Sequence, residues 1–502
     1  MSIARHTSYN FAGAAVPLAV SLITVPIYLS MVGTDRYGVL AICWLLLGYF
    51  NLFDLGLGRA TAQKIATLAD ASGHERSRIF WTSLILSGGL SLVAMALVAP
   101  AGYFGLRLLN VNNPALRAEF IGALPWLVAA TPFGILNGLL VGALEGRREF
   151  LKVNLANSVG TIATSVLPLG AALVFGPELS HLLAASLLGR AIAICLLAAV
   201  CIGAVPVQRP GGLVRTEMGQ LLRFGGWTTI SSVIGPILTF WDRFAIGVMI
   251  SSAAVALYVI PFNLVSQLAV VPAALATALF PRLAAAGAGE ARALGDESLQ
   301  VLAFVLAPAT LLSMVAAGLL LPLWLGARTA SEVSPVAYIL LFGFWANGLA
   351  RLPFAQLQAE RRPDLLAKAH LAELIPYVAF LYIGLRVAGI NGAAIAWSMR
   401  VTADAVILFT LTGISRSAIK TLLGQGLLLA IAVVTAVSLP TDAPERWLIH
   451  VGLLSILITL GMRNPPRKIV EYLELGIRSL SRIRSRRMSG KLGSPRQDHD
   501  AE

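Results

Sequence analysis

Long apolar runs separated by short polar segments make up most of this chain. About 20 helical residues are needed to cross the ~30 Å hydrocarbon core of a bilayer. The pattern predicts fourteen membrane-spanning helices, of which the last two are shorter, at 10–32, 37–58, 78–103, 119–143, 151–176, 179–204, 224–249, 254–280, 299–325, 334–358, 366–388, 390–412, 424–440 and 446–462. We therefore predict an all-α polytopic membrane protein.

Composition supports this prediction and narrows the function classes. The 502 residues are 57% hydrophobic and 13% charged, whereas soluble domains are about one quarter charged. The net charge of +13 does not indicate nucleic-acid binding, because the basic residues cluster in alternate loops such as "HERSR", "EGRREFLK" and "ERRPDLLAK". By the positive-inside rule, these loops and both termini are expected in the cytoplasm. The three cysteines lie in apolar runs, and we expect no metal, cofactor or enzymatic activity.

The chain contains an internal repeat. Residues 137–156 read "NGLLVGALEGRREFLKVNLA" and residues 347–372 read "NGLARLPFAQLQAERRPDLLAKAHLA". Each segment joins the fourth and fifth spans of a set of six, so the two sets are expected to be parallel. Two parallel bundles around a central cavity are typical of transporters. The predicted units are a six-helix lobe over 1–208, a second over 209–415, two further spans within 416–464, and a basic cytoplasmic tail over 465–502.

Four arginines lie inside predicted spans: Arg190, Arg243, Arg351 and Arg400. An arginine at bilayer depth costs at least ~2.5 kcal/mol, so it is expected to face a partner or a hydrated cavity. Arg190 and Arg400 fall near the middle of spans six and twelve, which are equivalent positions in the two lobes. Arginine stays charged and holds a phosphate bidentately. We predict that these four arginines are cavity cations for an anionic substrate. Arg190 is the strongest candidate, because no acidic residue lies within a turn of it on its own span.

Four acidic residues also lie inside predicted spans: Asp54, Asp242, Glu373 and Asp404. They are candidates for ion coupling or for structural ion pairs. Asp404 lies one turn after Arg400 on the same helical face and can neutralise it. Asp242 adjoins Arg243, which favours a structural pair. Asp54, in "FDLGLGRATAQK", is better placed to organise a helix end than to bind a ligand.

The segment "VPIYLSMVGTDRYGVLAICWLLLGYFNLFDLGLGRATAQKIA" resembles the opening of bacterial polysaccharide flippases, the O-antigen and exopolysaccharide transporters of the multidrug/oligosaccharidyl-lipid/polysaccharide superfamily. The two basic loops, "FWDRFAIG" at 240–247 and "LFPRL" at 279–283 also resemble this family. The resemblance covers about residues 5 to 420. It implies two six-helix lobes and flipping of undecaprenyl-pyrophosphate-linked oligosaccharide to the periplasmic leaflet of the inner membrane. A polysaccharide polymerase and glycosyltransferases are expected as possible partners.

Other functions stay open at this point. A multidrug or cation antiporter, or a lipid II flippase, of the same superfamily would share the fold. A scaffold of a polysaccharide-assembly complex without transport of its own would also fit. The tail, "RNPPRKIVEYLELGIRSLSRIRSRR", has apolar residues at helical spacing between arginines, and such a segment is expected to lie on an anionic membrane surface.

Overall fold

The computed structural model describes residues 18–68, 73–108, 114–205, 240–440, 442–463 and 465–466. Within these ranges every regular element is a helix. Parts of the predicted spans at 10–32 and 224–249, and almost the whole predicted tail, lie outside the described residues. The predicted all-α polytopic fold is confirmed, because ten helical segments of the described residues, with Pro114–Gly146 and Ser252–Ala285 each taken as one, are long and apolar enough to cross a membrane.

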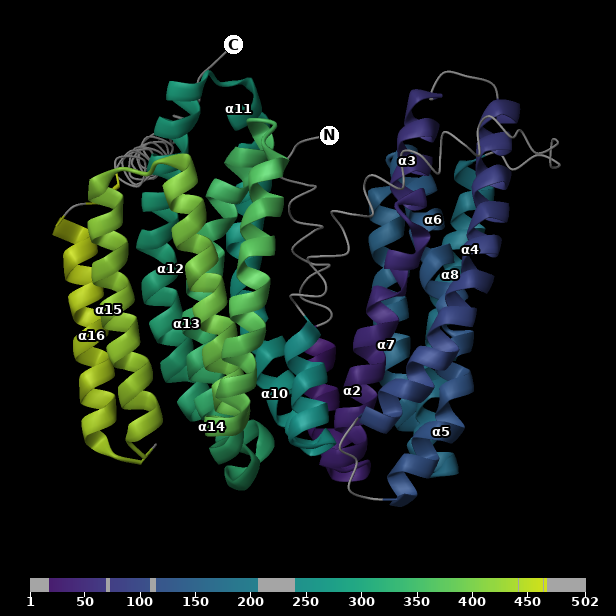
Figure 1. Ribbon diagram of the computed structural model, residues 1–502, viewed down its shortest axis with the longest axis horizontal. Coiled ribbons are helices and arrows are strands. Elements are labelled where there is room, and N and C mark those ends of the chain that lie inside the picture. The colour runs from purple at the N-terminus through teal and green to yellow at the C-terminus, as the bar shows by residue number, and fades with distance from the viewer. Residues whose placement is uncertain are drawn as a thin grey trace, which may run out of the picture.

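The helices form two groups that are continuous in sequence (Figure 1). The first group comprises a helix at Leu18–Met31, α2 (Thr34–Tyr49), the 3-10 turn η1 (Phe50–Asp54), α3 (Leu57–Thr67), α4 (Gly73–Leu108), α5 (Pro114–Ala129), α6 (Thr131–Gly146), α7 (Phe150–Phe175) and α8 (Leu179–Ala204). The second comprises a helix over 240–249, α10 (Ser252–Val265), η2 (Ser266–Ala269), α11 (Val270–Ala285), α12 (Ala288–Leu325), α13 (Ala327–Ala359) and α14 (Pro363–Thr412).

The two C-terminal helices belong to the second group. α15 (Arg416–Ser438) and α16 (Pro444–Arg463) pack against α12 and against each other, on the side away from the first group (Figure 1). Arg446 fixes the start of α16, since its buried guanidinium donates to the hydroxyl of Tyr338 on α13 and to the carbonyl oxygen of Leu439. α15 and α16 correspond to the spans predicted at 424–440 and 446–462.

A tight reversal divides α14 into two antiparallel segments. Ala388 (φ −134°) and Gly389 (φ 56°) leave the helical conformation, and the left-handed region is one that glycine adopts readily. The break falls between the predicted spans at 366–388 and 390–412. Beside it, a Cβ on Gly392 would overlap the carbonyl oxygen of Gly384, so the two segments touch backbone to backbone. Small residues allow this approach between membrane helices.

The internal repeat has the same backbone geometry in both copies. Arg148 and Arg361, 213 residues apart, both adopt positive φ (62° and 58°) after α6 and α13. In each copy the amide of the next residue donates to a carbonyl five positions back, Glu149 to Leu144 and Arg362 to Leu357. Such a bond closes a helix C-terminus and reverses the chain. The repeated basic loop therefore reflects a repeated helical hairpin, with α7 and α8 matching the two segments of α14.

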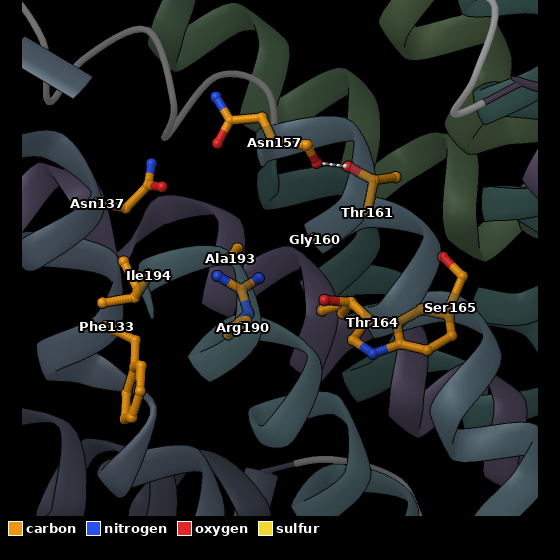
Figure 2. A pocket seen from close by; sticks show the side chains of 11 residues that line it. Phe133, Asn137, Asn157, Gly160, Thr161, Thr164, Ser165, Arg190, Ala193 and Ile194 are labelled. Atoms are coloured by element: carbon orange, nitrogen blue, oxygen red, sulfur yellow. Dashed lines mark hydrogen bonds between the residues drawn. The ribbon is translucent and has the colours of Figure 1, made fainter. Parts of the chain in front are cut away.

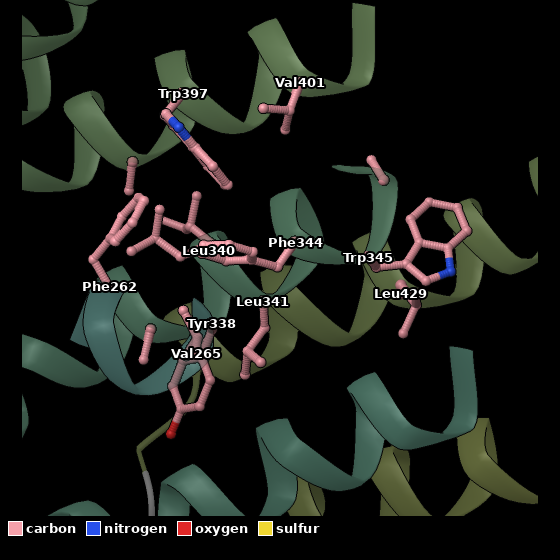
Figure 3. Close-up of a cluster of buried hydrophobic side chains, with 14 of the residues drawn as sticks. Phe262, Val265, Tyr338, Leu340, Leu341, Phe344, Trp345, Trp397, Val401 and Leu429 are labelled. Atoms are coloured by element: carbon pink, nitrogen blue, oxygen red, sulfur yellow. The ribbon is translucent and has the colours of Figure 1, made fainter. Parts of the chain in front are cut away.

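A dense apolar core surrounds α13, the most enclosed of the long apolar helices (Figure 3). Three aromatic side chains meet there, Phe262 of α10, Phe344 of α13 and Trp397 of α14, with ring centroids 4.7 to 5.2 Å apart. Aromatic pairs at this spacing add to the stabilisation that burial gives. The second group therefore has a rigid interior.

The two groups meet where α2 lies beside α10 (Figure 1). Gly38 permits the crossing, because a Cβ there would overlap the carbonyl oxygen of Ser252. The hydroxyl of Ser252 donates to Asp35 at 3.0 Å. Nearby, the indole of Trp324 donates to the carbonyl oxygen of Leu22 at 2.6 Å. We call the contact of Asp35, Gly38, Ser252 and Trp324 the inter-lobe seal.

The α14 reversal gives a stability prediction. We expect Gly392→Leu to lower the thermal midpoint of the purified protein, because overpacking a close contact costs roughly 1–3 kcal/mol. Gly88→Leu is the matched control, since nothing lies within 4 Å of a Cβ built on Gly88 of α4. Equal midpoints for the two variants would contradict the close contact.

Candidate functional site

A polar cavity of about 410 Å³ lies inside the first helix group (Figure 2). Helices α2, α6, α7 and α8 form its walls. Apolar side chains cover part of the lining, and the rest consists of amides, hydroxyls and one guanidinium. The lining residues are Trp44, Phe133, Asn137, Asn157, Gly160, Thr161, Thr164, Ser165, Arg190, Ala193 and Ile194. A cavity with this mixture suits a polar ligand that also offers some apolar surface.

Small residues bring α7 and α8 together at the level of Arg190. A Cβ on Gly189 would lie 2.6 Å from the amide nitrogen of Thr164, and one on Gly160 would lie 2.5 Å from the Cβ of Ala193. Gly189, which precedes Arg190, thus forms part of the contact between α7 and α8. Arg190 lies at the edge of that contact. Close helix packing therefore directs this long side chain into the cavity.

Arg190 has no acidic partner among the described residues. Its Nε is buried and makes no hydrogen bond there. In Figure 2 the guanidinium points into the cavity, with Asn137 and Asn157 on one side of it and Thr164 and Ser165 on another. These neighbours are neutral. The site therefore carries one uncompensated positive charge, surrounded by groups that can donate or accept hydrogen bonds.

A second charged cluster lies in the other helix group, and in it a carboxylate lies beside an arginine. Arg400 Nη1 lies 3.5 Å from Glu373 Oε2, across the two segments of α14, and the Arg400 guanidinium also lies over the ring of Tyr377 at 5.4 Å. His370 Nε2 lies 4.0 Å from Asp404 Oδ1. Glu373 and Asp404 are both buried. Among the described residues, the ion partner of Arg400 is therefore Glu373. It is not Asp404, which lies one turn along the helix and which the sequence offered as the neutralising acid.

Arg351 of α13 joins the edge of this paired cluster. It is exposed, and Asp404 is near enough to act on it electrostatically. The two copies of the repeat are offset by 213 residues, so the position equivalent to Arg190 is 403, three residues from Arg400. The two central arginines are therefore within one turn of equivalent positions, but only Arg190 lacks a described carboxylate partner.

The remaining predicted residues have structural surroundings. Arg243 Nη1 lies 3.0 Å from Asp242 Oδ1, and both side chains are buried. Tyr258 donates to Asp242 at 2.7 Å, and the Arg243 guanidinium stacks on Phe262 at 3.9 Å. This pair lies against the aromatic core of the second group. For Arg243 to act as the predicted cavity cation, its ion pair with Asp242 would have to break.

Asp54 organises a helix end, as the sequence suggested. Its Oδ1 accepts from the amide of Gly56 at 2.6 Å, and its Oδ2 accepts from the amide of Gly58 at 3.2 Å. Both amides belong to the start of α3. A carboxylate there satisfies donors that the helix itself leaves free.

Sequence reasoning missed the neutral residues of the cavity and one titratable group. Asn137, Asn157 and Thr161 line the site, but amides and hydroxyls in apolar runs are common and give no strong signal. The Asn-Gly pair at 137–138 marked the repeat and could have pointed to the cavity. His370 precedes Glu373 by one turn of helix, a spacing that could have linked it to the acidic cluster.

Comparisons of sequence agree on one family. Residues 3–286 match the family described as "Polysaccharide biosynthesis protein". A protein of Shigella flexneri named "Putative O-antigen transporter" is 30% identical over 413 residues, which is 81% of this chain and 97% of that protein.

Comparisons of structure agree on the fold. A structure described as lipid II flippase MurJ in an inward closed conformation has a TM-score of 0.70 at 14% identity, and covers 91% of this chain and 98% of its own. An inward-facing multidrug resistance transporter of the MATE family has a TM-score of 0.66 at 18% identity, over 81% of this chain and 99% of its own. These structures share the fold, and the sequence matches show that the chain belongs to the polysaccharide biosynthesis protein family.

Proposed function

We propose that this protein flips undecaprenyl-pyrophosphate-linked oligosaccharide repeat units from the cytoplasmic to the periplasmic leaflet of the bacterial inner membrane, with both termini in the cytoplasm. Family membership supports a flippase of lipid-linked polysaccharide precursors. The choice of a pyrophosphate-linked oligosaccharide as substrate depends on chemistry. A diphosphate needs a fixed cation, and sugars need hydrogen-bonding groups. The cavity around Arg190 offers both.

The observation that carries the proposal is the uncompensated charge of Arg190. A guanidinium inside a membrane region and without a carboxylate is costly, because the low local dielectric disfavours an isolated charge. An anionic ligand removes that cost and gains charge-assisted hydrogen bonds. The neutral amides of Asn137 and Asn157 can then bind hydroxyls of the adjoining sugar without competing for the cation.

Transport would follow from rocking of the two helix groups, with the inter-lobe seal closing one side of the membrane at a time. The seal is made of one close glycine contact and two hydrogen bonds, so it can open without breaking a buried ion pair. An inside-negative membrane potential would favour outward movement of the diphosphate, by ~2.3 kcal/mol per charge per 100 mV.

A cation antiporter of the same superfamily is the main competing function, and its strongest support is the pair of buried carboxylates at Glu373 and Asp404. Each of them lies within 4.0 Å of Arg400 or His370. A cationic substrate at Glu373 would therefore have to compete with the fixed charge of Arg400. This arrangement favours the anionic substrate.

The first prediction concerns Arg190. In proteoliposomes with fluorescent undecaprenyl-pyrophosphate oligosaccharide, we expect Arg190→Ala to slow translocation roughly ten- to hundredfold, the equivalent of a lost charge-assisted hydrogen bond. Arg190→Lys should be intermediate, since it keeps the charge and loses the planar fork. Arg386→Gln, at an exposed position of α14, is the matched control. Full activity of Arg190→Ala would refute the cavity assignment.

The second prediction separates structural from substrate-binding roles of Arg400. Arg400→Gln alone should accumulate poorly, because breaking a buried pair costs about 3–5 kcal/mol. The double variant Glu373→Gln with Arg400→Gln removes both charges and should recover accumulation and transport. Normal accumulation without transport would instead show that Arg400 acts directly on the substrate.

The third prediction tests the inter-lobe seal. Asp35→Cys and Ser252→Cys, in a chain whose natural cysteines Cys43, Cys195 and Cys201 are replaced by serine, should be joined by a short bifunctional thiol reagent, since the native side chains hydrogen-bond at 3.0 Å. Joining them should stop transport, and a reducible linker should allow recovery. Single-cysteine variants control for labelling alone. Continued transport by the joined protein would contradict rocking at this seal.

A further inference from the structure

A second polar cavity, of about 290 Å³, opens between α12, α15 and α16, away from the Arg190 cavity. It lies where α15 begins and α16 ends, so it is at one face of the membrane-spanning region. Both polar and apolar side chains line it. The lining residues are Gln300, Phe304, Lys420, Thr421, Gly424, Gln425, Leu457, Leu460, Gly461 and Pro466.

The polar part of this cavity carries a net positive charge. Lys420 is exposed, and among the described residues no carboxylate lies within 4.0 Å of its ammonium group. The nearby acid, Asp296, is already engaged: it accepts from the amide of Ser415 at 2.9 Å and from the side chain of Gln300 at 3.3 Å. One turn before Lys420, Arg416 adds a second exposed cation.

The cavity also holds an unsatisfied polar group. Gln425 Oε1 is shielded from solvent and has no hydrogen-bond partner among the described residues. A buried amide of this kind costs free energy unless a ligand or water binds it. Its nitrogen and oxygen are not distinguished by shape, so the amide can turn either a donor or an acceptor toward a ligand.

The surface next to the cavity is apolar and faces the bilayer. Leu423 and Leu427 of α15 and Leu460 of α16 are 69%, 64% and 51% exposed. Nothing lies within 4 Å of a Cβ built on Gly424, and a Cβ on Gly461 would lie 2.8 Å from the ring of Phe304. A molecule with a charged end in the cavity could therefore continue as apolar chains along these helices.

We propose that this cavity binds the phosphate headgroup of an anionic phospholipid, with Lys420 and Gln425 on the phosphate oxygens and the acyl chains along Leu423, Leu427 and Leu460. Basic pockets between membrane helices at the bilayer surface bind anionic headgroups by this chemistry. The bound lipid would join α15 and α16 to α12, and so fix the two added helices to the six-helix unit. This site does not depend on the transported substrate.

The test uses the full-length protein, stripped of lipid in detergent. Dioleoyl phosphatidylglycerol should raise its thermal midpoint and remain bound in native mass spectra, whereas dioleoyl phosphatidylcholine should do neither. Lys420→Ala should weaken phosphatidylglycerol binding roughly tenfold or more. Lys368→Ala, an exposed lysine on α14 outside the cavity, should not change it.

Two further arms separate the possible outcomes. Gln425→Leu should weaken lipid binding without lowering the midpoint of the lipid-free protein, because it removes an unpaired buried amide rather than a contact. Inorganic phosphate should give no stabilisation, since it lacks the chains. Equal binding by wild type and Lys420→Ala, or equal stabilisation by inorganic phosphate, would overturn the proposal.

Discussion

The burial of fixed positive charge constrains this molecule more than any other feature. Arginine cannot lose its proton at neutral pH, so each guanidinium inside the membrane region needs a carboxylate, an aromatic face, a helix-end carbonyl or a ligand. Arg243 has Asp242 and Phe262, Arg400 has Glu373 and Tyr377, and Arg446 has Tyr338. Arg190 opens instead onto a polar cavity. The substrate chemistry that we propose follows from this one difference.

The two helix groups contain the same helical hairpin but use it differently. In the first group, α7 and α8 meet through glycine and alanine, which leaves room for a cavity beside Arg190. In the second group, the corresponding segments of α14 enclose Glu373, Asp404 and Arg400, with Glu373 beside Arg400, next to a dense aromatic core. One group therefore suits ligand binding, while the other suits mechanical rigidity. Such a division is consistent with rocking of two preformed units.

Much of the fold was predictable because membrane insertion imposes simple rules. Run length predicted most of the long apolar helices, and the short break at Ala388 and Gly389 fell between two predicted helices. The repeat was visible because Arg148 and Arg361 occupy the same turn after α6 and α13, with the same positive φ. These features depend on local sequence, which a single chain displays directly.

The site was predictable only in part, because partner choice is a tertiary property. The sequence singled out Arg190 by the lack of an acid on its own helix, and that reasoning needed no neighbouring helix. It could not show that Glu373 rather than Asp404 lies beside Arg400, since that contact depends on how the segments of α14 cross. Asn137 and Asn157 reach the cavity from separate helices, and nothing in their local sequence distinguishes them.

In the mechanism that we propose, Arg190 contacts the anionic end of the lipid-linked substrate. The most direct measurement is an experimental structure of the full-length protein with undecaprenyl-pyrophosphate oligosaccharide bound. We predict the diphosphate within hydrogen-bonding distance of the Arg190 guanidinium, with the first sugar beside Asn137 or Asn157. A diphosphate held elsewhere, with Arg190 contacting only protein, would contradict the account.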